Sequence, residues 1–407
     1  MNAQGTSATD GSTPAGLQPG APAGSYSLGG FDNVNLFNGH MNFGLPLLHI
    51  GGRGGAGYTI NLDLERQWRT RKTTSAPWVT WPETGPWNGP QVGYSPGVMV
   101  GRVVGVPNSG TCEENEGWRD TLTRLTFIGA DGTEYEFRDV LHNGDAQSSY
   151  YNSDCSIGST ASRGKVFVTK DGSGVTFISD AEILDAYSFY IDEIYPSGYL
   201  LLKDGTRYHI SDGVVTSIQD RNGNKVTLEN VGRLITDSLN RTVTVAYRYD
   251  TWPQSDHDEI TFKGTAGTTR TLRVWYSAMS TALRSGFSIQ TYQQLFPEMN
   301  GSTSESFNPT VATSLELPDG RLYYFKYNSY GELARVELPT GGAFEYDYAA
   351  GLRSGAASGS YGGGGGYTTK QIYRRVVEKR IYKDSSAVYE SRMTISRPDY
   401  SVTQTVR

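Results

Sequence analysis

Several residue classes are scarce in this chain of 407 residues, and each scarcity excludes a class of protein. The only cysteines are Cys112 and Cys155, too few for a disulfide framework or a cysteine-rich metal scaffold. Both lie in polar stretches typical of loops, which leaves two alternatives open: one disulfide formed in an oxidising compartment, or two unpaired thiols. The first alternative fits a secreted or surface protein.

Long apolar runs are missing as well. No stretch approaches the roughly 20 residues of a transmembrane helix, and no charged-then-apolar leader begins the chain. Charged residues make up only 19%, with 36 Lys and Arg against 42 Asp and Glu, for a net charge of −6. Because there is no basic excess to attract a phosphate backbone, we expect neither a membrane span nor a nucleic-acid partner.

Glycine and tyrosine, in contrast, are abundant, with 50 and 27 residues respectively. From about residue 31 onward, apolar and polar residues alternate in short runs, as in Tyr58, Ile60, Leu62 and Leu64. Alternation of this kind places one side of a strand in a core, and glycine supplies tight turns. The sequence therefore predicts an all-β fold of repetitive antiparallel hairpins.

Composition and periodicity divide the chain into successive segments. They are a disordered Gly-, Ala-, Ser- and Pro-rich segment (1–30), an N-terminal β entry region with a Trp- and Pro-rich irregular excursion (31–121), a β-hairpin repeat region (122–276), a loop-like insertion with room for one short helix at 291–296 (277–310), a pair of 21-residue repeats (311–350), a flexible Gly-rich loop (351–366) and further strands that we expect to be truncated (367–407). A ribbon cut short exposes strand edges and an apolar inner face, so we expect the chain to self-associate.

The clearest repeat joins a tight turn to the strand that follows it. Leu317-Pro-Asp-Gly recurs as Leu338-Pro-Thr-Gly, a period of 21 residues (338 − 317). Asp-Gly and Asn-Gly pairs favour hairpin turns because glycine adopts positive φ angles at little steric cost. The turn residues that we identify are Asp131, Gly132, Asp204, Gly205, Asn222, Gly223, Asp319, Gly320 and Gly341. A second pattern, from Asp to Val, is shared by 220–226 and 237–243, so the hairpins stack around one continuous core.

Residues 325–333, Phe-Lys-Tyr-Asn-Ser-Tyr-Gly-Glu-Leu, resemble the YD repeat of RHS (rearrangement hotspot) proteins, Tyr-x-Tyr-Asp-x-x-Gly-Arg-Leu. Asn328 and Glu332 depart from that pattern. Partial matches occur at 232–234, Gly-Arg-Leu, and at 247–250, Tyr-Arg-Tyr-Asp. The segment from residue 33 to residue 55 also resembles the start of many bacterial RHS-repeat proteins.

This resemblance implies that the hairpins form a spiralling β-sheet ribbon, part of a hollow β-shell. In RHS proteins and their relatives in toxin complexes, a β-sheet ribbon spirals into a shell that encloses a C-terminal toxic domain. The present chain has few, degenerate repeats, and its sequence shows neither a toxin domain nor an aspartate-based self-cleavage segment. We therefore expect an N-terminal part of a longer product, whose partner is the C-terminal shell or toxin segment.

Short motifs that match the sequence patterns of cofactor or metal sites are better explained as turns. The stretch 52–57 satisfies a dinucleotide-binding pattern, but a strand alternation follows it instead of a helix, which favours a glycine turn. Asp256, His257, Asp258 and Glu259 form the densest group of metal-ligand residue types, and we interpret them as a solvated turn.

Carboxylates flank a Tyr-rich strand, and they raise the question of a glycosidase, because such enzymes need two acids close together. Asp185, Asp192 and Glu193 are the candidates, and we interpret them as exposed charges at a strand edge. We assign no residue a catalytic, cofactor-binding or metal-binding role, and we expect no cofactor.

Three functions of different classes follow. The leading hypothesis is a structural, non-enzymatic β-shell segment of a secreted or cell-surface bacterial protein, which shields or presents a downstream effector domain. The alternative is a cell-surface carbohydrate-binding or adhesive module, with Trp78, Trp81 and Trp87 as stacking platforms for glycans. The third is a β-rich polysaccharide hydrolase, which no motif supports.

Overall fold

The computed structural model describes residues 25–27, 31–35, 41–64, 67–73, 79–85, 94–107, 118–130, 134–145, 150–151, 157–159, 161–170, 172–185, 193–350, 367–372, 374–384, 388–395 and 402–406. Of the segment expected to be disordered, 1–30, only residues 25–27 are among them. The expected Gly-rich loop, 351–366, lies outside the described residues.

The described chain consists almost entirely of β-strands. They are β1 (Ser25–Ser27), β2 (Asp32–Asn35), β3 (Met41–Gly51), β4 (Gly57–Asp63), β5 (Gln67–Thr73), β6 (Thr80–Gly85), β7 (Gly97–Pro107), β8 (Trp118–Gly129), β9 (Glu134–Asp139), β10 (Tyr150–Tyr151), β11 (Ile157–Ser159), β12 (Ala161–Ser162), β13 (Val166–Thr169), β14 (Thr176–Ser179), β15 (Leu184–Asp185), β16 (Glu193–Ile194), β17 (Gly198–Leu201), β18 (Arg207–Ser211), β19 (Val214–Gln219), β20 (Lys225–Glu229), β21 (Leu234–Thr236), β22 (Thr242–Ala246), β23 (His257–Lys263), β24 (Thr269–Ala278), β25 (Thr310–Glu316), β26 (Leu322–Tyr327), β27 (Leu333–Glu337), β28 (Ala343–Ala350), β29 (Tyr367–Ile372), β30 (Arg374–Tyr382), β31 (Ser391–Ile395) and β32 (Val402–Val406). The helical elements are two 3₁₀ turns, η1 (Thr265–Gly267) and η2 (Met279–Thr281), and helix α1 (Tyr292–Leu295).

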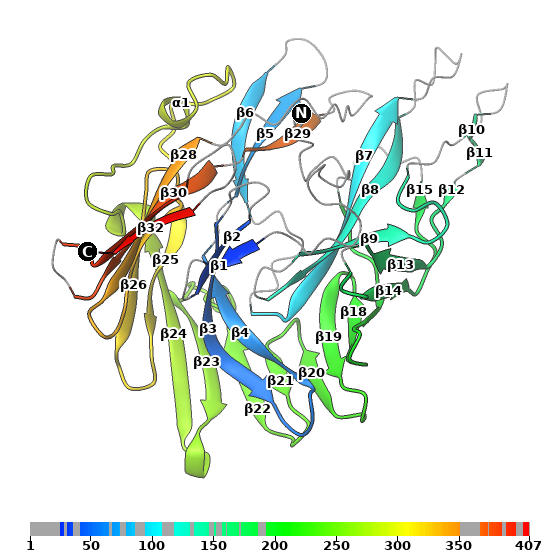
Figure 1. The fold of residues 1–407 in the computed structure, drawn as a ribbon, viewed down its shortest axis with the longest axis horizontal. Helices are drawn as coiled ribbons and strands as arrows, with labels where there is room; N and C mark the ends of the chain where they lie inside the picture. Colours follow the sequence, from blue (N-terminus) through cyan, green and yellow to red (C-terminus); the bar gives the residue numbers. More distant parts are fainter. Residues whose placement is uncertain are drawn as a thin grey trace.

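Most strands belong to one large antiparallel sheet (Figure 1). Its pairings run from β7 through β8, β9, β13, β14, β17 and β18 to β19, and continue hairpin by hairpin to β32. The sheet closes on itself where Val214 of β19 pairs with Val98 of β7. The predicted all-β fold of repetitive antiparallel hairpins in one large sheet is therefore confirmed.

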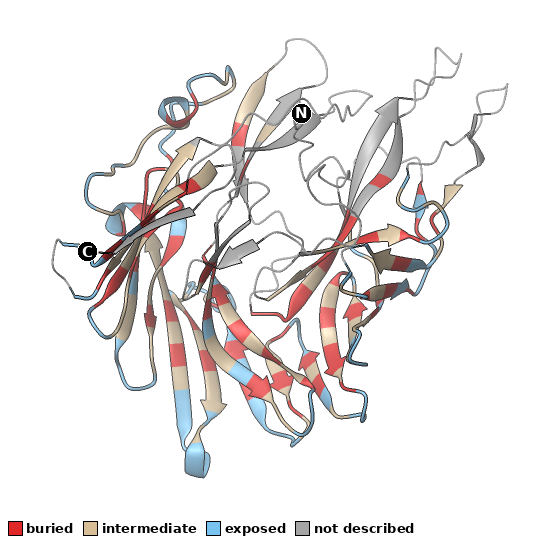
Figure 2. Ribbon diagram, in the orientation of Figure 1, coloured by how far each residue is buried: buried red, intermediate tan, exposed pale blue. Residues whose placement is uncertain are grey.

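We call strands β19–β28 and β30–β32 of this sheet the ribbon. Buried residues alternate with exposed or half-buried ones along several of its strands, among them β20, β21, β22 and β31. In β22, Val243 and Val245 are buried, and Thr242, Thr244 and Ala246 are exposed. Figure 2 shows buried positions spread over successive strands, whereas the tip of the β23–β24 hairpin is exposed. Since successive side chains point to opposite faces of a strand, the ribbon has an apolar inner face and a polar outer face.

Strands β1–β4 form a separate four-stranded sheet, and its β3–β4 hairpin lies along the ribbon near β22 and β23 (Figure 1). At the hairpin tip, the Gly55 N–H donates to Asp220 Oδ2 at 2.9 Å. Behind the tip, Leu45 and Ile60 are buried in a core shared with the ribbon. The inner face that we expected to be exposed is thus covered by the chain's own N-terminal strands, which removes that reason for self-association.

A three-stranded sheet, in the order β29-β5-β6, joins segments near both ends of the sequence. Strands β5, β6 and β7 are regular, so the prediction of an irregular excursion is wrong for these three strands. Proline residues made this region look irregular in the sequence. Pro82 nevertheless lies in β6, which is an edge strand, and proline is tolerated there because no hydrogen bond of the sheet needs its missing N–H.

The short helix expected at 291–296 is confirmed as α1. Thr291 caps it, because its Oγ1 accepts a hydrogen bond from the Gln294 N–H at 3.2 Å, while Gln294 Oε1 accepts one from the Thr291 N–H at 2.9 Å. The insertion that carries α1 packs around Trp68 of β5, whose Nε1 donates to Tyr330 O at 2.9 Å. Aromatic rings of the insertion, including Phe296 at a centroid distance of 4.7 Å, surround that indole.

One three-residue loop recurs between strands. The residue before the loop donates its N–H to the carbonyl of the residue after it, and the third loop residue donates back to the carbonyl of the residue before the loop. Copies span residues 202–206, 220–224, 237–241, 317–321, 328–332 and 338–342. The third loop residue has positive φ in every copy: Gly205, Gly223, Asn240, Gly320, Gly331 and Gly341. This is a type I turn closed by a bulge, so the Asp-Gly and Asn-Gly pairs supply one positive φ, at glycine, and not two.

Three copies of this loop are capped by a buried side chain. Asp220, Asp237 and Asn328 stand before the loop, and each Oδ1 accepts hydrogen bonds from two N–H groups of its loop region, at 2.8–3.1 Å. The pKa of Asp220 is lowered to about 2, chiefly by the hydrogen bond from the Asn224 side chain. Asn328, which stands where the YD pattern has Asp, therefore performs the same capping as the two aspartates.

Candidate functional site

The inner side of the ribbon is the candidate functional region, because polar as well as apolar contacts hold another part of the chain there. Lys379 Nζ of β30 lies 2.6 Å from Asp32 Oδ2 of β2, and the Tyr346 hydroxyl of β28 donates to the same oxygen at 2.7 Å. All three side chains are almost fully buried. We call this group the clasp, since it fastens the N-terminal strands to the C-terminal part of the ribbon.

The electrostatics of the clasp follow from its burial. Desolvation, reinforced by the Asp32 charge, raises the pKa of Tyr346 well above its ordinary value and keeps the phenol protonated. Desolvation lowers the pKa of Lys379, an effect that the neighbouring carboxylate partly opposes. The three groups satisfy one another inside the core, so the arrangement is suited to holding strands together and not to chemistry on a dissolved substrate.

A second buried carboxylate fastens the segment before β7 to the ribbon. Asp258 Oδ2 accepts hydrogen bonds from the hydroxyls of Tyr276, at 2.8 Å, and Tyr94, at 3.0 Å, while its Oδ1 accepts one from the Arg248 N–H at 2.8 Å. Burial is the main cause that raises the pKa of both tyrosines. The Tyr94 ring also stacks on Tyr247 at a centroid distance of 5.9 Å.

The group at 256–259 does not lie in the solvated turn that we predicted. From His257 onward these residues pair with β24, and the strand separates their side chains: Asp258 faces the core, whereas His257 and Glu259 are only half-buried. His257 Nδ1 lies 2.9 Å from Asp256 Oδ1, and its ring packs on Trp275 at 4.5 Å. In the part of the chain that the structure describes, no cluster of three or more His, Cys, Asp or Glu is placed to hold a metal ion.

Asp185, interpreted from the sequence as an exposed charge, is fully buried, so that interpretation is wrong. The Arg163 guanidinium explains the burial: its Nε lies 3.0 Å from Asp185 Oδ2, and its Nη1 lies 3.0 Å from Asp139 Oδ2. A carboxylate enclosed in this way is not available as a glycosidase acid. Asp192 lies outside the described residues.

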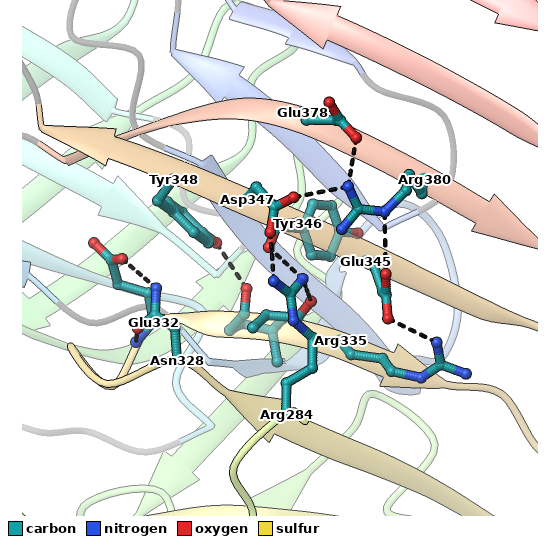
Figure 3. A network of polar contacts seen from close by, with 12 residues as sticks. Arg284, Asn328, Glu332, Arg335, Glu345, Tyr346, Asp347, Tyr348, Glu378 and Arg380 are labelled. Carbon is teal, nitrogen blue, oxygen red and sulfur yellow. Dashed lines mark hydrogen bonds and ion pairs between the residues drawn. The ribbon is translucent and has the colours of Figure 1, made fainter. Parts of the chain in front are cut away.

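The outer face carries a network of ion pairs (Figure 3). Glu345 lies between Arg335 Nη1, at 2.9 Å, and Arg380 Nε, at 3.1 Å, and Asp347 contacts both Arg380, at 2.7 Å, and Arg284. Burial opposes ionisation of Asp347, but hydrogen bonds from Arg380 and Arg284 lower its pKa. Because Arg284 belongs to the 277–310 insertion, the network ties that insertion to the ribbon.

The structure places only some of the residues selected from the sequence. Trp81 is half-buried in β6, where it pairs with Arg71, while Trp78 and Trp87 lie outside the described residues, so no aromatic platform of the three can be drawn. Other selected residues that lie outside the described residues are Cys112, Cys155, Asp131 and Gly132. Asp204, Gly205, Asn222, Gly223, Asp319, Gly320 and Gly341 lie in the recurring loop.

Sequence reasoning missed the clasp and the Asp258 hydrogen bonds. Lys379 stands in a charged run, which by itself indicates a polar face, and nothing around Asp32 marks a buried ion pair. The sequence signal for the clasp is a charged residue at a strand position whose side chain points inward. Alternation identifies such a position only when the strand register is known. The register between β28 and β30 shifts between Asp347 and Tyr348, so simple alternation does not show that Lys379 points inward.

No protein-family model and no curated protein matches this chain. The resemblance to RHS repeats therefore stays an expectation drawn from the motifs alone. Among the described helices, none is long and apolar enough to cross a membrane.

Proposed function

We propose that this chain is a structural, non-enzymatic segment of a β-shell that encloses polypeptide on the inner side of its ribbon. The observation that carries the proposal is the burial of the β3–β4 hairpin against the inner face of the ribbon, with the clasp holding β2 beside it. A continuous sheet with an apolar inside and an ion-paired outside is suited to shielding a chain from solvent. The wider product would be a secreted or cell-surface bacterial protein with a downstream effector domain.

The mass of the native product in its producing cells tests this proposal. An antibody against residues 198–250 should detect a species several times heavier than 44.5 kDa. In that species, the part enclosed by the shell should resist protease while folded and be cleaved after unfolding in urea. A species near 44.5 kDa, or a downstream part cleaved at the same rate in both states, would contradict the proposal.

A specific observation favours the carbohydrate-binding alternative as well. Between β22 and β23, Trp252 is 93% exposed and Tyr249 is 47% exposed, close to the stacked ring of Tyr247. Exposed aromatic rings of this kind provide faces on which sugars stack. If this function holds, a glycan-array signal should be lost in Trp252→Ala and kept in Leu239→Ala, which shortens an exposed apolar side chain in the turn at the other end of β22.

A further inference from the structure

A cavity of about 740 Å³ lies between the β3–β4 hairpin and the strands on the other side of the molecule, β8, β9, β17 and β18. It adjoins the face of the hairpin that does not pack on the ribbon: Gly44, Pro46, Thr59 and Asn61 line it, whereas the alternate residue Ile60 is buried in the core. Its volume lies within the range of roughly 300–1,000 Å³ that is typical of small-molecule sites.

The two walls of this cavity differ in chemistry. The hairpin side presents the small residues Gly44, Gly57 and Thr59 together with Tyr58. The opposite side presents large apolar and aromatic residues: Phe127, Tyr135, Leu200, Leu202 and Tyr208. Aromatic rings on both sides match a flat or elongated molecule with an apolar body, because such a body contacts both walls at once.

The polar residues that line the cavity limit the charge that a bound molecule can carry. Asp32 is the charged residue that lines the cavity, and its carboxylate is already neutralised by Lys379 and bonded to Tyr346. Asn61 donates through Nδ2 to Ala130 O at 2.8 Å, which turns its amide toward the end of β8, and within the described residues its Oδ1 accepts no hydrogen bond. Among the described lining residues there is therefore no unpaired counter-charge for an ion, and Asn61 Oδ1 is an acceptor for a hydroxyl or amide N–H.

We propose that this cavity is a binding site for an uncharged small molecule with an apolar body and one hydrogen-bond donor, held between the β3–β4 hairpin and the aromatic side chains of β8, β9 and β18. The donor bonds to Asn61 Oδ1. The site is separate from the shell role, since it uses the hairpin face that is turned away from the ribbon.

Binding of the uncharged dye Nile red to the full chain, followed by fluorescence, tests the site. We expect saturable binding of one dye per chain. Gly44→Val should weaken it at least tenfold while leaving the melting temperature unchanged or higher, because a Cβ at Gly44 meets only Asn61 Cβ, at 3.9 Å, and the added side chain fills the cavity. Gly55→Val is the matched control: its Cβ meets only Asp220 Cβ, at 4.0 Å, outside the cavity, so dye binding should persist.

The hydrogen-bond donor is tested with a pair of probes. Wild-type protein should bind 1-naphthol more tightly than naphthalene, and Asn61→Leu should abolish that difference while still binding naphthalene. Dye bound to exposed apolar side chains elsewhere, such as Leu141 or Val166, would be insensitive to Gly44→Val. An absence of saturable dye binding by folded wild type, equal binding by Gly44→Val, or equal affinity for the two probes in wild type would overturn the proposal.

Discussion

Single buried charges hold this fold together where strands from distant parts of the sequence meet. Asp32 and Lys379 are 347 residues apart, yet their side chains form an ion pair within the core. Arg163 plays a similar part between Asp139 and Asp185. Breaking such a pair by removing one partner is costly because the other charge stays buried without compensation.

Replacing Asp32 by Asn should therefore destabilise the protein by about 3–5 kcal/mol, since the Lys379 ammonium would remain buried without its counter-charge. Urea unfolding followed by fluorescence gives the free energy. The control is Arg321→Ala, which removes an exposed pair with Asp319 and should change stability by no more than about 1 kcal/mol. Equal effects of the two substitutions would show that the clasp contributes little.

Buried tyrosines predict a loss of stability at alkaline pH. Burial raises the pKa of Tyr247 to about 12, whereas an unfolded tyrosine titrates near 10. Above pH 10 the unfolded chain releases protons that the folded chain retains, so stability is complete below pH 10 and falls as pH rises from 10 toward 12.

Urea midpoints measured between pH 8 and 11.5 check this prediction. In Tyr247→Phe the slope above pH 10 should be shallower by up to about 1.4 kcal/mol per pH unit, the contribution of one proton. A wild-type midpoint that does not change across this range would refute the assignment of protonated, buried tyrosines.

At the scale of elements, the recurring three-residue loop joins many of the hairpins. Its third residue needs a positive φ, which accounts for glycine at Gly320, Gly331 and Gly341 and for asparagine at Asn240. The first two loop residues vary in identity, whereas the bonds across the loop are made by backbone groups that every residue type except proline supplies. Strand register is thereby set locally, hairpin by hairpin.

Substitution at Gly341 tests whether the third residue of the loop needs a positive φ. Its φ is +94° and no atom lies within 4 Å of the position that a Cβ would take, so backbone strain is the only expected penalty. Gly341→Ala should cost about 1–2 kcal/mol, and Gly341→Asn should cost less, because asparagine tolerates this region. Thermal unfolding separates the two. Gly55→Ala, at a turn position without positive φ, should lie within about 0.5 kcal/mol of wild type.

At the scale of the whole molecule, the ribbon is stable because it encloses part of its own chain. Strands β3 and β4 pack on the apolar inner face, and β5 pairs with β29, which joins the N-terminal and C-terminal parts. The same arrangement explains why the core is continuous although the sheets are separate. A chain organised in this way should expose its apolar inner face only when the hairpin is displaced.

Ile60→Asp should displace it, since a carboxylate would be forced into a fully buried position. We expect strong binding of the dye anilinonaphthalene sulfonate and self-association in sedimentation velocity. His49→Asp, at an exposed position of the same hairpin, should behave like wild type. If Ile60→Asp stayed compact and bound no dye, the hairpin would not be what covers the inner face.

Much of this protein was determined by local sequence. Alternation of apolar residues and Asp-Gly or Asn-Gly pairs specified the strands, the turns and the all-β fold, because a strand buries alternate side chains and a turn needs only a few neighbouring residues. Only the tertiary structure decided that Asp32 meets Lys379, that Asp185 is enclosed by Arg163 and that the hairpin fills the ribbon. These contacts join residues far apart in the sequence, and their partners are selected by the path of the whole sheet, which no local pattern encodes.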